Sequence, residues 1–133
     1  MLEASVLWTD NERFLGQASS GHALAVDAAG QNKTASSPME LVLIGLCACT
    51  ASDVVSILRK KREPFTSVQV RAQAERAEQP PRVFTSIKLV YIVGGDVSEK
   101  AVEDAVRLSK EKYCSVSAML QKSASISFEI RYA

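Results

Sequence analysis

The feature that most constrains this chain is a long segment that would be apolar on every side of a helix. Ser37, Pro38 and Glu40 form a strong helix start, because serine can cap, proline suits the first helical position and glutamate completes a capping box. The basic run 59–62 suits a helix C-terminus, and Pro64 blocks continuation. The pattern predicts a helix of roughly 25 residues, about 37 Å long.

From Leu41 to Cys49 this helix is apolar on every face, which is typical of a helix that is buried all round. The chain has 133 residues, 47% apolar and 23% charged, as expected for one globular domain spanning 1–133. One domain of this length can hardly surround such a helix. We therefore expect a second copy of the chain to cover it.

Charge and composition exclude several classes of protein. Sixteen basic and fifteen acidic residues give a net charge of +1, without the basic excess of a nucleic-acid-binding protein. The longest apolar run, 39–51, is interrupted by Glu40 and Thr50 and is interpreted as too short and too mixed to span a bilayer. Residues 1–5 show no secretory signal. We expect a soluble, cytoplasmic protein with no nucleic-acid or membrane partner.

Hydrophobic periodicity predicts the remaining elements. Strands and helices do not alternate simply, so we expect an α+β fold with a mostly antiparallel sheet. The predicted order is three strands, the long helix, a two-stranded hairpin, two helices and a last strand. Beside the long helix, the predicted segments are strands at 3–8, 13–18, 22–27, 66–76, 83–93 and 124–132, and helices at 99–113 and 114–120.

The three cysteines carry the chemical interest of the chain. An odd number without a secretory signal is a poor disulfide framework. Cys47 and Cys49 lie about 200° apart on a helix, which disfavours a zinc site using both, and Cys47 is interpreted as packing. Cys49 could also be a small buried apolar residue. Cys114 begins a new helix, whose free amides would stabilise a thiolate.

Two segments resemble the cysteine motifs of the OsmC/Ohr family. Residues 37–50, Ser-Pro-Met-Glu-Leu-Val-Leu-Ile-Gly-Leu-Cys-Ala-Cys-Thr, resemble the first motif, and residues 114–117, Cys-Ser-Val-Ser, resemble the second, Cys-Pro-Val-Ser. The continuation 50–55 and the segment 113–117 look most like the YhfA-like branch. The resemblance covers the whole chain. It implies an OsmC-like α+β fold with a long buried central helix, an intertwined homodimer and active sites at its interface.

The resemblance also implies a chemistry, because characterised relatives are thiol peroxidases that reduce organic hydroperoxides. By match, Cys49 would attack the peroxide and become a sulfenic acid. Cys114 would resolve it to a disulfide, which an external dithiol reduces. The resemblance implies no metal and no organic cofactor.

The activating groups depart from the family's pattern. Its peroxidase branches commonly have a glutamate ten residues before the first cysteine, where this chain has Met39. Glu40 follows about 100° further round the helix and is a candidate site residue as well as a capping residue. Arg13 is the candidate activating cation, and Ser115 replaces the proline of the second motif.

Three hypotheses stay open at this stage. The first is a peroxidase with the roles given above. The second is a small-molecule binding or redox-sensing module in which Cys49 is reversibly modified. The third is a dimer whose cysteines only pack.

Overall fold

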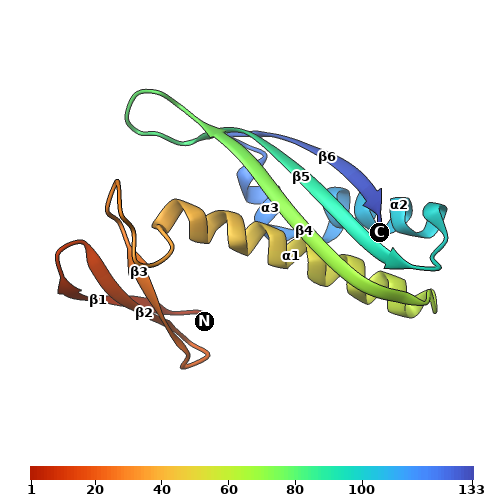
Figure 1. Ribbon diagram of the computed structural model, residues 1–133, viewed down its shortest axis with the longest axis horizontal. Coiled ribbons are helices and arrows are strands. Elements are labelled where there is room, and N and C mark those ends of the chain that lie inside the picture. Colours follow the sequence, from red (N-terminus) through yellow and green to blue (C-terminus); the bar gives the residue numbers. More distant parts are fainter. The chain divides into compact units, whose positions relative to one another are not determined.

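The computed structural model describes residues 1–133 and confirms the predicted α+β class and order of elements (Figure 1). The chain forms two compact units, residues 1–44 and 45–133, which are described separately. The single domain over 1–133 stays a prediction. The strands are β1 (Ala4–Asp10), β2 (Arg13–Ala18), β3 (Ala23–Asp27), β4 (Phe65–Arg76), β5 (Phe84–Gly95) and β6 (Ser125–Tyr132). The helices are α1 (Pro38–Lys60), α2 (Glu99–Leu108), a π-helical turn η1 (Ser109–Tyr113) and α3 (Ser115–Leu120).

The N-terminal unit is an antiparallel sheet in the order β1-β2-β3, followed by a loop and the first turns of α1. The Asp27 carboxylate organises the loop after β3. It accepts hydrogen bonds from the Ala29 amide at 2.9 Å and from the amide and hydroxyl of Thr34 at 2.9 and 2.8 Å. These bonds hold the pKa of Asp27 below its usual value.

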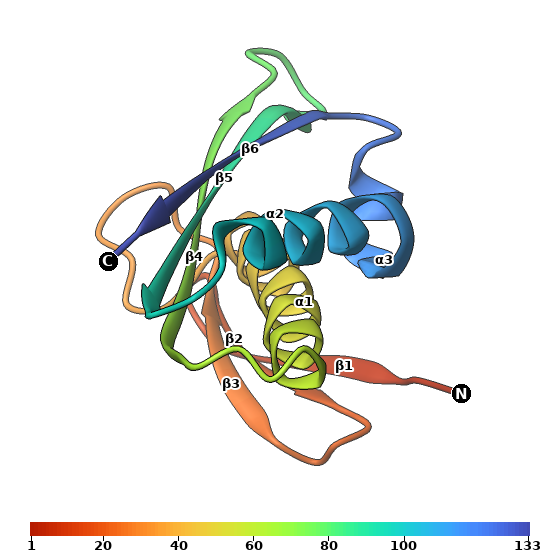
Figure 2. The ribbon, with the colours of Figure 1, turned by 90° about the vertical axis from the view of Figure 1, so that its right-hand side faces the viewer.

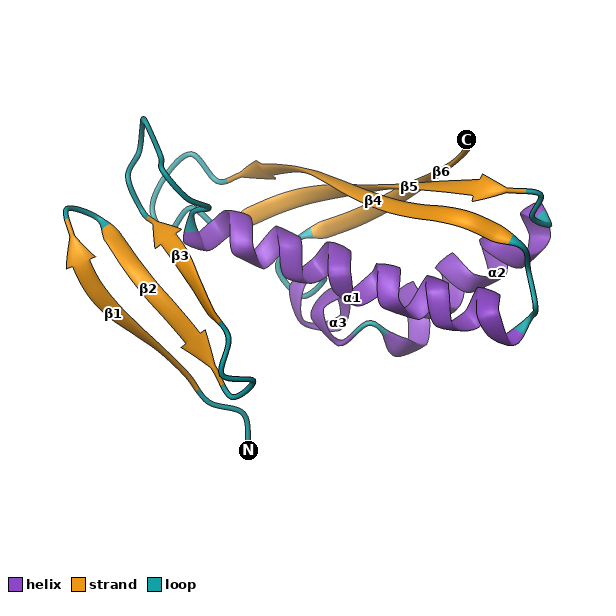
Figure 3. Ribbon diagram, turned by 60° about the horizontal axis from the view of Figure 1, so that its bottom comes forward, coloured by secondary structure: helices purple, strands orange, loops and turns teal.

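The C-terminal unit is built on the sheet β4-β5-β6, with β5 in the middle (Figure 3). β5 runs antiparallel to β4 and parallel to β6, and α2, η1 and α3 form the crossover that a parallel pair requires. The register places the predicted apolar faces side by side, for example Val70, Tyr91 and Ile130. Figure 2 shows α2 and the C-terminal part of α1 on the same side of this sheet.

One face of α1 is covered within the chain. Leu46, Thr50, Val54 and Leu58 are buried at intervals of four residues, so they form a single stripe along the helix. Ala48, Ser52 and Ser56 on another side are exposed. The sequence predicted that α1 is buried on every face, and within a single chain only one face of the helix is buried.

The apolar helix is longer than the 39–51 run suggested. Over 18 residues of α1 the mean hydropathy reaches 2.2, which by length and composition alone is enough to cross a membrane. The sequence-based exclusion on length was therefore too strict. Core helices of soluble proteins reach the same values.

Candidate active site

α1 and the turn before α3 bring Cys49 and Cys114 together, although 65 residues separate them in the chain. Cys49 is half-buried, Cys114 is only 3% exposed, and both are free thiols. Burial, with a smaller contribution from the neighbouring Cys49, raises the pKa of the Cys114 thiol to about 11, and the hydrogen bond from the Ser117 amide opposes this shift.

The position of Cys114 depends on the π-helical turn. The sequence predicts one helix over 99–113, but the α-helical part ends at Leu108. The Cys114 amide then donates to the Ser109 carbonyl at 2.8 Å, five residues back, which adds one residue to the turn. Cys114 caps α3, and its sulfur accepts a hydrogen bond from the Ser117 amide at 3.3 Å. This confirms the prediction that Cys114 begins a new helix.

A chain of buried hydroxyl groups lies next to the two cysteines. The Ser109 hydroxyl donates to Oδ2 of Asp53 at 2.8 Å. The Thr50 hydroxyl lies 2.8 Å from that of Ser109 and 2.6 Å from that of Tyr91. Because each hydroxyl has one proton, Thr50 must donate to Ser109, and Tyr91 must donate to Thr50. The four groups therefore form one directed chain that ends at the Asp53 carboxylate.

The three hydroxyl groups of this chain are sealed from solvent, whereas Asp53 at its end is half-buried. The side chains of Thr50, Tyr91 and Ser109 are all fully buried. Burial raises the pKa of Tyr91 to about 12. Sequence reasoning did not single out these residues. The sequence carried one signal of a buried polar cluster: Asp53 is the one charged residue between Glu40 and Arg59 of an otherwise apolar helix.

Glu40 lies in a capping box at the start of α1. Its Oε1 accepts from the Ser37 amide at 2.9 Å, and its own amide donates to the Ser37 hydroxyl at 3.2 Å. The bond from the Ser37 amide lowers the pKa of Glu40. The capping role expected from the sequence is confirmed, and the role of Glu40 in the site stays a prediction.

Arg13 belongs to the N-terminal unit, at the start of β2. Its Nε and Nη2 donate to the two carboxylate oxygens of Asp10. This ion pair raises the pKa of Arg13. Its predicted role as the activating cation stays a prediction.

A groove of about 350 Å³ opens beside Asp53 in the C-terminal unit. Ile57 and Leu108 give it apolar walls, and Tyr113 adds an aromatic ring. Lys60 and Lys61 stand at the same opening. An organic molecule with an apolar body would find both apolar and polar contacts here.

The buried Cys114 thiol should titrate far above an ordinary cysteine. In a Cys47→Ala, Cys49→Ala variant, where Cys114 is the remaining thiol, we expect ultraviolet thiolate absorbance to appear well above the usual pKa of about 8.5. The folded pKa is raised, so the stability that Cys114 contributes is complete below the unfolded pKa. It is lost as the pH rises toward the folded value. The same variant unfolded in urea is the control. Equal midpoints in the two states would contradict the expectation.

The two cysteines and the topology together define the class of protein. The sequence profile described as OsmC-like protein matches residues 30–129, so the chain belongs to the OsmC-like family. It is 46% identical over 132 residues to Protein YhfA of Escherichia coli K12, covering 97% of this chain and 98% of that protein. It is thus a soluble protein of the OsmC fold.

Solved structures share this fold. A hypothetical protein from Aquifex aeolicus has 33% identity and a TM-score of 0.86, covering 100% of this chain and 98% of that one. An organic hydroperoxide resistance protein OsmC from Legionella pneumophila has 16% identity and a TM-score of 0.74, covering 98% and 96%. At that identity the likeness concerns the fold alone.

Proposed function

We propose that this protein is a thiol-dependent peroxidase that reduces organic hydroperoxides, with Cys49 as the attacking and Cys114 as the resolving cysteine. The observation that carries the proposal is the proximity of the two thiols: Cys49 lies close enough to Cys114 to raise its pKa, although 65 residues separate them in the chain. Membership of the OsmC-like family supports a redox role. A structural neighbour from Legionella pneumophila is described as an organic hydroperoxide resistance protein.

The reaction begins at Cys49, which is more exposed than Cys114. The Cys49 thiolate attacks the terminal peroxide oxygen, an S–O bond forms, the O–O bond breaks, and the alkoxide leaves as an alcohol after taking up a proton. Cys49 is then a sulfenic acid, oxidised by two electrons. The Cys114 sulfur attacks the Cys49 sulfur, the S–O bond breaks, and the oxygen leaves as water. An external dithiol reduces the disulfide and is itself oxidised.

The environments of the two sulfurs support this division of roles. The raised pKa of Cys114 keeps it a thiol at neutral pH, so its S–H can stabilise negative charge on Cys49 by hydrogen bonding. The groove beside Asp53 offers apolar walls for the organic part of a hydroperoxide. We retain Arg13 as the proposed activating cation and Glu40 as a proposed site residue.

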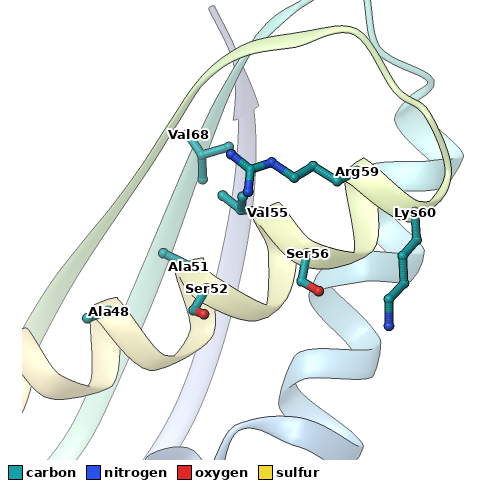
Figure 4. A pocket seen from close by; sticks show the side chains of 8 residues that line it. All are labelled: Ala48, Ala51, Ser52, Val55, Ser56, Arg59, Lys60 and Val68. Atoms are coloured by element: carbon teal, nitrogen blue, oxygen red, sulfur yellow. The ribbon is translucent and has the colours of Figure 1, made fainter.

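The proposal includes a homodimer in the cytoplasm. A groove of about 520 Å³ runs along the uncovered face of α1, lined by the small side chains of Ala48, Ala51, Ser52 and Ser56 (Figure 4). Arg59 extends over Val55 at its far end. Small side chains let a second helix approach closely, so this face suits a second copy of the chain. Three free cysteines fit a reducing compartment that holds a dithiol reductant.

A binding or redox-sensing module is the second candidate. It is favoured by the Asp53 carboxylate, which together with burial opposes thiolate formation at Cys114. If Cys114 resolved slowly, Cys49 would remain in a modified form long enough to act as a signal.

Consumption of cumene hydroperoxide under excess dithiothreitol separates the two candidates. We expect turnover in the wild type and none above the uncatalysed rate in Cys49→Ser, because the attacking sulfur is gone. Cys47→Ser is the matched control on the same helix and should behave as the wild type. Wild-type turnover no faster than that of Cys49→Ser would reject the peroxidase proposal for this class of substrate.

A further inference from the structure

Ser109 links the two parts of the chain that carry the cysteines. Its hydroxyl bonds to Thr50 and Asp53, which lie one and four residues after Cys49 on α1. Its carbonyl accepts the Cys114 amide at 2.8 Å and closes the π-helical turn. One fully buried residue thus holds α1 with its side chain and the backbone of Cys114 with its main chain.

The bonds of Ser109 leave it little freedom. Its single proton goes to Asp53, and the proton of Thr50 comes to it, so the Ser109 side chain is held from two sides. Tyr91 of the central strand fixes Thr50 in turn. The sheet, α1 and the π-helical turn are therefore joined through one continuous buried chain.

Disulfide formation is sensitive to such placement, because the bond requires narrow ranges of Cα separation and torsion. We propose that Ser109 is a positioning residue for the redox pair: it fastens the π-helical turn to α1 and so sets the separation across which Cys49 and Cys114 close. The inference rests on the proposed function, because the peroxidase cycle is what requires a disulfide between these two cysteines.

The test measures disulfide formation without peroxide. Wild type and variants are equilibrated in glutathione redox buffers, where two thiols of the protein become one disulfide and one glutathione disulfide becomes two glutathiones. The fraction of Cys49–Cys114 disulfide is read by mass spectrometry. We expect Ser109→Ala to lower the equilibrium constant by about tenfold or more, because small misplacements of reacting groups have effects of this size.

Two comparisons separate positioning from a general loss of packing. Ser117→Ala removes another buried hydroxyl in the same segment, one that has no hydrogen-bond partner, and should leave the equilibrium unchanged. Asp53→Asn keeps an oxygen that can accept from Ser109 and should rescue most of the effect seen in Asp53→Leu. If Ser109→Ala does not fold, Thr50→Val, which keeps the side-chain shape, should show a smaller fall in the same direction, because Ser109 keeps its bond to Asp53.

The inference is overturned if Ser109→Ala matches the wild type, if Ser117→Ala falls equally, or if the wild type forms no Cys49–Cys114 disulfide. Failure of the proposed function looks different. In that case cumene hydroperoxide is not consumed, while the glutathione equilibrium still responds to Ser109→Ala and not to Ser117→Ala.

Discussion

Cys114→Ser is expected to consume one equivalent of cumene hydroperoxide and then nearly stop. The attacking sulfur of Cys49 remains, so the first oxidation proceeds. The second step then needs a dithiol from solution in place of a neighbouring sulfur. Because well-oriented intramolecular groups act at effective concentrations far above millimolar, we expect turnover at low dithiol to fall by about 100-fold or more.

The intermediate itself gives the direct measurement. Dimedone should label Cys49 in oxidised Cys114→Ser, whereas the wild type should form the disulfide before it is labelled. Cys47→Ser serves as the control, because Cys47 is half-buried and its burial raises its pKa. Wild-type turnover in Cys114→Ser at low dithiol would remove Cys114 from the mechanism and leave Cys49 working alone.

Ala51→Glu is expected to weaken self-association by about 100-fold or more. Ala51 lies in the groove along α1, on the face that the proposed second copy would cover (Figure 4). A carboxylate buried there would lose its hydration, and the cost of several kcal/mol corresponds to a change of this size. Sedimentation over a range of protein concentrations measures the dissociation constant.

Lys122→Glu is the control for this second experiment. It changes the charge at an exposed residue of the turn after α3, and the Lys122 side chain takes part in no ion pair or hydrogen bond. A wild type that sediments as a monomer at all concentrations would reject the homodimer. Equal association of Ala51→Glu and wild type would place the interface elsewhere on the chain.

Local patterns accounted for most of the fold. The capping box at Ser37 and Glu40 and the alternating face of β5 around Tyr91 involve residues close together in sequence, so their geometry follows from short-range rules. The family motifs likewise singled out Cys49 and Cys114.

The π-helical turn and the hydroxyl chain could not be predicted in this way. The charge and apolar pattern over 99–113 is compatible with an unbroken α-helix, and only contacts with other elements select the wider turn. Tyr91 lies 41 residues after Thr50 in the chain, and Ser109 lies 59 residues after it. Their types carry no local signal, because serine, threonine and tyrosine occur in many other settings.

The extra residue in the turn Ser109–Tyr113 makes the site dependent on chain length as well as on residue type. Loss of one residue there would let α2 continue as an ordinary helix and would rotate everything after it by about 100°. Cys114 would then keep its identity and its neighbours in sequence but face away from Cys49. Single-residue deletions between α2 and α3 are therefore a route by which a relative could retain both cysteine motifs and lose their pairing.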